Sequence, residues 1–274
     1  MTTEVLVRPH IDPFKQRDTK AKKVYARAVT VCIAAACQDQ EEPRIILCSD
    51  TRLDFAEFGS TNTTVKVDVL GYSWCAQLAG GWSGAMYFRS LLKRIMQARQ
   101  SAPKQLEDIE SVVQEAFEEF LESCFCEDDG AYEVLLSGFL DEGPVLVGVS
   151  VQQKKLGLTL GDSFLSIGSG STIASTLLRL RECNPSMKLS YATYLVYESK
   201  RAAEHDGSVG RFTALAIQAP GAGIRDRAYL KVMNEVGKAH LEAAYSGLWK
   251  VPFAEIPELT PAFFLDPAAP QSRQ

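Results

Sequence analysis

Residues 30–54, TVCIAAACQDQEEPRIILCSDTRLD, decide the fold of this chain. Two apolar runs in this stretch, TVCIAAAC and RIILCSDTR, have the length of β-strands, and the polar segment QDQEEP between them predicts a hairpin loop. Antiparallel pairing brings the start of the first strand to the end of the second. We therefore expect the Thr30 hydroxyl, the Asp50 carboxylate and the Arg52 guanidinium at one end of a sheet.

Outside this hairpin, the pattern alternates between strands and pairs of helices. Two β-rich runs, TVKVDVL and SWCAQLAG, are expected to extend the hairpin into a four-stranded meander. The other expected elements are helices over 83–99 and 104–125, strands over 132–140, 144–152, 156–160 and 163–170, helices over 171–181 and 189–204, strands at FTALAIQA and AYLKV, and a helix over 234–245. This order predicts an α+β fold in which two antiparallel sheets stack face to face, with a helical layer on each outer side.

Composition and charge limit the classes of partner. The chain has 274 residues, and none of its apolar runs reaches the length of a membrane span. Residues 1–29 hold no continuous apolar segment of the secretory type, so we expect a cytoplasmic protein without a membrane partner. These residues carry a charge of +4, whereas the net charge of −5 leaves −9 for the rest of the chain. Such an acidic body argues against nucleic acid as a partner.

The seven cysteines are scattered through apolar segments. An odd number in a chain without an export signal predicts reduced, buried thiols. Cys124 and Cys126 form the one close pair, and no second pair accompanies them. We therefore expect neither a metal site nor a cofactor.

Further short motifs place polar groups at the ends of expected elements. Lys66 lies between valines in TVKVD, and Gly80 ends a strand directly before a helix, where a backbone N–H is open to an anion. Gly168-Ser169-Gly170 joins a strand to a helix, and HDGSVG (205–210) joins a helix to a strand. Each motif also has an ordinary interpretation as a solvent-facing lysine, a tight turn or a cap, and Thr30 alone is an ordinary strand residue.

One reaction uses these groups together, namely acyl transfer by a threonine hydroxyl. The hydroxyl needs a base, and a threonine at a chain terminus supplies its own free α-amine, whose unperturbed pKa is about 7.7–8.0. A lysine beside the threonine lowers the pKa of both groups, an aspartate holds the lysine, and backbone N–H groups bind the oxyanion. Cys32 is an alternative nucleophile, but it alternates with Ile33 on a strand and has no histidine nearby, so core packing is its expected role.

Six motifs, TVCIA, SDTR, TTVKV, LAGG, IGSG and HDGSVG, follow one another at defined intervals. The separations are 16 residues from Asp50 to Lys66, 14 from Lys66 to Gly80 and 37 from Ser169 to Asp206. In order and spacing, the motifs resemble the proteasome β-subunit and its bacterial relatives, the ancestral-β-subunit (Anbu) group and the HslV-type peptidases. The resemblance covers about residues 30–245, and it implies an N-terminal-nucleophile (Ntn) hydrolase with a four-layer αββα fold.

The resemblance also assigns roles to individual residues. It implies Thr30 as the nucleophile, with its freed amine as the base, and Lys66 as the residue that tunes this base. The other implied site residues are Asp50, which holds Lys66, Gly80, which donates the oxyanion N–H, and Ser169 and Asp206, which complete the hydrogen bonds around the amine. Arg52 matches a strand-end arginine of the family with a structural role.

Domain organisation, substrate and assembly follow from the same resemblance. Residues 1–29 are an N-terminal extension or propeptide, residues 30–245 the hydrolase domain and residues 246–274 a Pro-rich C-terminal tail. Removal of residues 1–29 yields a threonine amidohydrolase or peptidase that acts on peptide or amide bonds. Because the family forms rings, we expect a homo-oligomer. The chain has no phosphate-binding loop, so any ATP-dependent unfoldase would be a separate partner.

The chain departs from the family pattern at three points. Thr30 is preceded by 29 residues, Val29 stands where the family usually has glycine, and the family's second serine falls on Val209, with Ser208 one place away. The alternative function is therefore a catalytically inactive scaffold subunit with an intact N-terminal extension, as in the proteasome α-subunits. Retention of Lys66, which a scaffold does not need, argues for the hydrolase.

Overall fold

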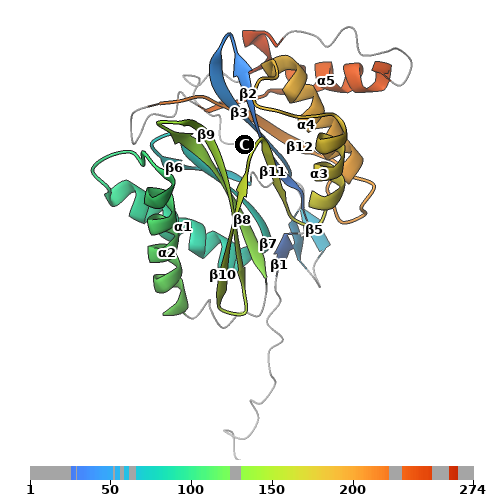
Figure 1. Ribbon diagram of the computed structural model, residues 1–274. Helices are drawn as coiled ribbons and strands as arrows, with labels where there is room; N and C mark the ends of the chain where they lie inside the picture. Colours follow the sequence, from blue (N-terminus) through green and yellow to red (C-terminus); the bar gives the residue numbers. More distant parts are fainter. Residues whose placement is uncertain are drawn as a thin grey trace, which may run out of the picture.

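The computed structural model describes residues 26–28, 30–51, 53–55, 59–61, 66–123, 131–221, 230–248 and 259–264. Within these ranges, the chain forms two antiparallel sheets and five α-helices (Figure 1). This content confirms the expected α+β class.

The larger sheet has eight strands among the described residues. Its order is β10-β9-β8-β7-β1-β4-β5, and β6 pairs with β7 on the same edge as β1. The bounds are β1 Ala26–Ala28, β4 Leu53–Phe55, β5 Gly59–Thr61, β6 Val67–Gly71, β7 Trp74–Gly81, β8 Tyr132–Leu140, β9 Gly143–Gln152 and β10 Lys155–Gly161. Along β7, the pairing with β6 stops at Gln77 and the pairing with β1 covers Gly80 and Gly81. Lys66, which directly precedes β6, therefore lies at the gap between β6 and β1.

The smaller sheet contains the opening stretch at its centre. Its order is β11-β2-β3-β12-β13, with β2 Cys32–Asp39, β3 Glu42–Asp50, β11 Phe164–Ile167, β12 Thr213–Gln218 and β13 Leu230–Val232. The turn between β2 and β3 consists of Gln40 and Glu41, whose φ angles are 50° and 73°. The hairpin loop is shorter than the expected QDQEEP because a two-residue turn with positive φ matches the twist of paired strands.

The expected four-stranded meander is wrong. β6 and β7 pair with each other, but they lie in the larger sheet rather than beside β3. Both outer edges of the β2–β3 hairpin are occupied, because β11 pairs with β2 and β12 pairs with β3. The two strands that fill these edges come later in the chain, so the local pattern gave no sign of them.

Helices pack on the outer face of each sheet. α1 (Trp82–Ala98) and α2 (Leu106–Leu121) share a hydrophobic core with the larger sheet. α3 (Ser171–Leu180), α4 (Leu189–Ala203) and α5 (Glu235–Leu248) share a second core with the smaller sheet. In the part of the chain that the structure describes, no helix combines the length and the apolar character needed to cross a membrane.

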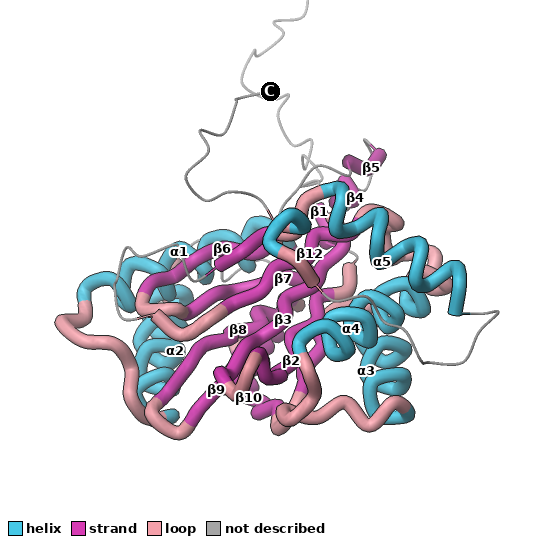
Figure 2. The backbone as a smooth tube through the Cα atoms, turned by 90° about the horizontal axis from the view of Figure 1, so that it is seen from above, coloured by secondary structure: helices cyan, strands magenta, loops and turns pink. Residues whose placement is uncertain are grey.

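The two sheets face each other across a third core cluster. It contains small side chains, including Cys32, Ala34 and Ala79, together with Leu47 and Leu135. Alternate residues of facing strands fill such a space between two sheets. The resulting order of helices, sheet, sheet and helices is visible in Figures 1 and 2 and is compatible with the expected sandwich.

Part of the Pro-rich tail returns to the folded domain. The 3₁₀ helix η2 (Pro261–Phe263) lies against α5, and the Asn234 amide donates to the Phe263 carbonyl at 2.8 Å. Phe264 also forms an antiparallel bridge with Met233. Residues 259–264 are therefore packed against the last helix.

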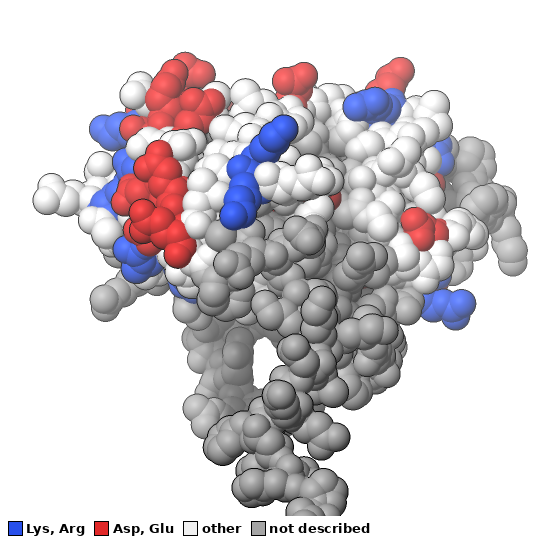
Figure 3. Space-filling model, turned by 90° about the horizontal axis from the view of Figure 1, so that it is seen from below, with Lys and Arg blue, Asp and Glu red and all other residues white. Residues whose placement is uncertain are grey.

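Acidic side chains gather on one side of the molecule. Figure 3 shows such groups on the side where α1 and α2 lie, and α2 contains six acidic residues: Glu107, Asp108, Glu110, Glu115, Glu118 and Glu119. Lys and Arg side chains lie among these groups in Figure 3, and Arg94 pairs with Glu119. The acidic residues of α2 nevertheless outnumber such partners, and an excess of negative charge repels the phosphate backbone of nucleic acids. The absence of a nucleic-acid partner stays a prediction, and this charge supports it.

Candidate active site

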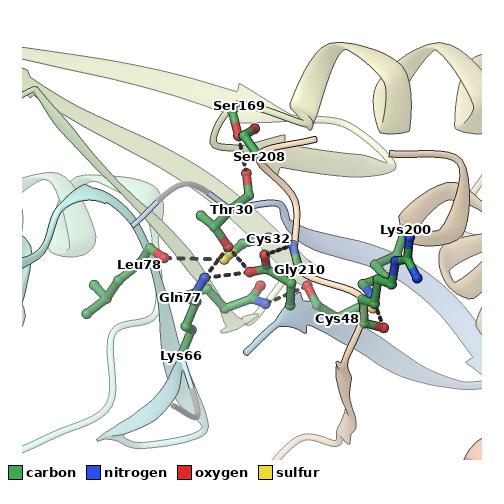
Figure 4. Close-up of polar contacts among 12 residues, drawn as sticks. Thr30, Cys32, Cys48, Lys66, Gln77, Leu78, Ser169, Lys200, Ser208 and Gly210 are labelled. Atoms are coloured by element: carbon green, nitrogen blue, oxygen red, sulfur yellow. Dashed lines mark hydrogen bonds and ion pairs between the residues drawn. The ribbon is translucent and has the colours of Figure 1, made fainter. Parts of the chain in front are cut away.

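Thr30, Asp50 and Lys66 form a buried hydrogen-bonded cluster. Lys66 Nζ lies 2.5 Å from Thr30 Oγ1 and 2.5 Å from Asp50 Oδ1, and the Thr30 hydroxyl donates to the same Oδ1. Figure 4 shows the Lys66 and Thr30 side chains pointing toward each other. Thr30 is fully buried, and the side chains of Asp50 and Lys66 have no exposed area. The lysine and the carboxylate compensate each other's charge at a place where either charge alone would be costly.

Two different sheets supply these three residues. Thr30 lies two residues before β2 and Asp50 ends β3, so the hairpin pairing brings them together. The Asp50 amide donates to the Val31 carbonyl at 3.2 Å. This is the proximity that the opening stretch predicts. Lys66 comes from the larger sheet, and its burial excludes the interpretation of this residue as a solvent-facing strand lysine.

The two oxygens of Asp50 have separate partners. Oδ1 faces Lys66 and Thr30, whereas Oδ2 accepts the Gly210 N–H at 2.6 Å. Gly210 closes the HDGSVG segment, and Thr213, three residues later, is opposite Asp50 in the β12–β3 pairing. The backbone of this segment therefore fixes the carboxylate with Oδ1 directed at the threonine. This role of Gly210 was not expected from the sequence, because a backbone donor has no side-chain signature.

The Gly168–Gly170 turn holds the carbonyl group of Thr30. The Ser169 hydroxyl donates to this carbonyl at 3.1 Å, and the Gly170 amide does so at 3.2 Å. Gly168 has a φ of +91°, and a Cβ added there would lie 2.4 Å from the Thr30 oxygen. Both the backbone conformation and the close approach therefore require glycine at this position.

Glu133 supports the same turn and was not expected from the sequence. Its Oε2 accepts the Gly168 N–H at 2.8 Å from β8 in the larger sheet. The one feature of the sequence that could have indicated Glu133 is that it is the single acidic residue in the apolar strand YEVLLSGFL. Glu133 thus joins the larger sheet to the turn against Thr30.

Asp206 and Ser169 are connected through Ser208. The single proton of the Ser208 hydroxyl is shared between Asp206 Oδ1 at 2.5 Å and Ser169 Oγ at 2.8 Å. The hydrogen bonds from the Ser208 hydroxyl and amide hold the pKa of Asp206 below its ordinary value of 3.8. Ser208, one place from the position that the resemblance gives, is the serine of this network. Val209 instead lies 4% exposed in the core of the smaller sheet.

Gly80 lies beside the N-terminal extension. It is opposite Ala28 of β1 on one side and Tyr132 of β8 on the other. Its φ is +90°, and a Cβ there would lie 2.5 Å from the Ala131 oxygen, so this position also requires glycine. Among the hydrogen bonds between described residues, Gly80 does not join the cluster around Thr30. Its role as oxyanion donor stays a prediction.

Residues 26–28 of the extension form a strand inside the larger sheet. β1 pairs with β7 through Arg27 and Ala28 and with β4 through Ala26 and Arg27. Residues 26–28 are therefore held on both edges next to Gly80. Val29 and Arg52 lie outside the described residues.

Cys32 has the packing role expected of it. It is fully buried, and its Sγ lies 3.4 Å from the Leu78 carbonyl. Burial raises the pKa of the Cys32 thiol to about 12, so the thiol is neutral near pH 7 and a poor nucleophile. Five cysteines in the described ranges are free and buried, while Cys124 and Cys126 lie outside them.

In the described part of the chain, no group of three or more His, Cys, Asp or Glu side chains is arranged to hold a metal ion. The cluster itself can perform proton transfer and nucleophilic chemistry. It places a hydroxyl against both a carboxylate that accepts its hydrogen bond and an ammonium that stabilises negative charge on its oxygen. Comparison with known proteins adds no assignment, because neither a protein-family model nor a curated protein matches the chain.

Proposed function

We propose that the chain is a threonine-type Ntn hydrolase of the proteasome β-subunit kind, which removes residues 1–29 and then hydrolyses peptide or amide bonds through Thr30. The observation that carries this proposal is the position of the Lys66 ammonium, buried at 2.5 Å from both Thr30 Oγ1 and Asp50 Oδ1. A buried ion pair contributes little to stability compared with well-packed apolar residues. Its direct contact with a hydroxyl therefore favours a chemical role.

The proposed removal of the extension is an acyl transfer within the chain. Thr30 Oγ1 attacks the carbonyl carbon of residue 29, its proton passes through the Asp50 cluster to the Thr30 nitrogen, and the C–N bond breaks to leave an ester. Water then hydrolyses the ester, which releases residues 1–29 with a terminal carboxylate. Thr30 is left with a free hydroxyl and a free α-amine, the pair that serves as nucleophile and base on later substrates.

The β1 strand supports a peptide as substrate. Ala26–Ala28 is extended and paired on both edges beside Gly80. Addition of a strand is a common way to bind an extended peptide through its main chain. In this proposal, the extension occupies before cleavage the place that a peptide occupies afterwards.

An assay of peptide-amide hydrolysis tests the proposal. The purified protein and its Thr30→Ser variant, which keeps a hydroxyl, are expected to release a fluorophore from unstructured peptide amides, and Thr30→Ala is expected to be inactive. Equal rates for the unmodified protein and Thr30→Ala would refute catalysis by this residue. Hydrolysis that persists in Thr30→Ala but is lost in Cys32→Ala would identify the Cys32 thiol as the nucleophile.

The alternative function is a scaffold subunit that keeps its extension. The double-edged pairing of β1 in the larger sheet favours it, because a strand integrated in this way also stabilises an uncleaved chain. A homo-oligomer, cytoplasmic localisation and an ATP-dependent unfoldase partner stay predictions under either function.

A further inference from the structure

A second fully buried lysine lies on α4. Lys200 Nζ donates to Glu204 Oε1 at 2.5 Å and to the Arg211 carbonyl at 2.9 Å, and its side chain has no exposed area. Burial lowers the pKa of Lys200, while the bond to Glu204 opposes this shift. A charge in such a place needs a reason beyond packing, because its desolvation is costly.

The carbonyl that Lys200 holds belongs to the segment that supports Asp50. Residues 205–212 form most of the connection between α4 and β12, and Gly210, next to Arg211, donates to Asp50 Oδ2 at 2.6 Å. Ser208 in the same segment bonds to Ser169, which in turn donates to the Thr30 carbonyl. Lys200 therefore holds the backbone at Arg211, the residue next to Gly210, whose N–H orients the Asp50 carboxylate. In the view of Figure 4, Gly210 lies between Thr30 and Lys200.

We propose that Lys200 is a positioning residue for the threonine site, which acts by holding the 205–212 segment in place. The Gly210 N–H can then donate to Asp50 Oδ2, while Oδ1 contacts Lys66 and Thr30. The effect on cleavage rests on the proposed function. The effect on the Gly210–Asp50 contact does not.

Arg201 is a matched control within the same ion-pair group. Arg201 Nη1 contacts Glu204 Oε2 at 3.2 Å, so it shares the carboxylate with Lys200. Among the described contacts, Lys200 bonds to the Arg211 carbonyl and Arg201 does not. In Lys200→Met, Glu204 keeps Arg201 as a partner, and in Arg201→Met it keeps Lys200. Both variants remove one positive charge, but only the first releases the segment.

The test compares these two variants by structure and by rate. In the full-length Thr30→Ala background, selective ¹⁵N-glycine labelling follows the Gly210 amide, assigned by its loss in Gly210→Ala. Lys200→Met is expected to move this resonance and to speed hydrogen exchange over 205–212, whereas Arg201→Met leaves both unchanged. With Thr30 present, Lys200→Met is expected to slow removal of residues 1–29 by about 100-fold, as for misplaced catalytic groups, and Arg201→Met by far less.

Equal effects of the two variants on the Gly210 resonance would overturn the proposal, as would a Lys200→Met protein that loses only thermal stability. A shifted resonance with an unchanged cleavage rate would likewise exclude a positioning role. If the unmodified chain is never cleaved, the proposed function fails, while the resonance comparison still decides whether Lys200 holds the segment.

Discussion

Lys66 and Lys200 are both buried without exposed side-chain area, and each lies 2.5 Å from a carboxylate oxygen. They differ in their second contact. Lys66 reaches a side-chain hydroxyl, whereas Lys200 reaches a backbone carbonyl. We propose that the two ammonium groups have different roles: Lys66 acts on the hydroxyl that would react, and Lys200 holds the chain segment beside it. Burial and pairing are the same for the two lysines, so the proposed difference in role rests on the second contact.

Replacement of Lys66 is expected to have the largest effect. Lys66→Met leaves Asp50 buried without its counter-charge, so we expect a loss of about 3–5 kcal/mol in the free energy of unfolding and no detectable removal of residues 1–29. Urea unfolding and intact mass measure these two outcomes.

A second variant separates stability from chemistry at Lys66. Asp50→Asn/Lys66→Met removes both charges, so part of the lost stability should return while cleavage stays absent. If either variant removes residues 1–29 as fast as the unmodified protein does, Lys66 has only a structural role.

Gly168→Ala is expected to have the next largest effect, because it disturbs the turn that holds the Thr30 carbonyl. The φ of +91° alone costs about 1–3 kcal/mol for a residue with a Cβ, and the new methyl group would collide with the Thr30 oxygen. We expect lower stability and little cleavage. Gly143→Ala is the control, since its φ is +129° but a Cβ there meets nothing within 4 Å. If the two variants lose equal stability and cleave equally, the contact with Thr30 has no importance.

Ser208→Ala is expected to have the smallest effect, which is a change in how the free energy of unfolding depends on pH. Loss of the hydroxyl should raise the pKa of Asp206 toward its ordinary value, although the Ser208 amide still donates to it. A carboxylate whose pKa is lower in the folded than in the unfolded state stabilises the fold at pH values above its unfolded-state pKa. This contribution is lost as the pH falls through its folded-state pKa. The variant should therefore show a weaker fall in stability below about pH 4.

The measurement for Ser208→Ala is an NMR titration of Asp206, together with urea unfolding across the acid range. Ser169→Ala is the matched control, because it removes a bond to the Thr30 carbonyl but leaves the Ser208–Asp206 contact in place. An identical Asp206 pKa in both variants would contradict the role of the Ser208 hydroxyl.

The sequence predicted individual elements well, because each depends on local periodicity. The strand over 132–140 has the bounds of β8, and the opening hairpin correctly brought Thr30 beside Asp50. The placement of TVKVDVL and SWCAQLAG beside the opening hairpin was wrong, because strands that come later in the chain occupy both edges of this hairpin. Within the site, motif spacing indicated Lys66, but it could not distinguish Ser208 from Val209, whose orientations are set by the turn from Asp206.

The proposed hydrolase depends on cleavage of the bond between Val29 and Thr30. Intact mass spectrometry of the purified full-length protein, incubated at neutral pH beside Thr30→Ala, tests it most directly. The unmodified chain is expected to become 29 residues shorter and to begin at Thr30, while Thr30→Ala keeps all 274 residues. A mass that stays at full length for both proteins under every condition would contradict the hydrolase and leave the scaffold.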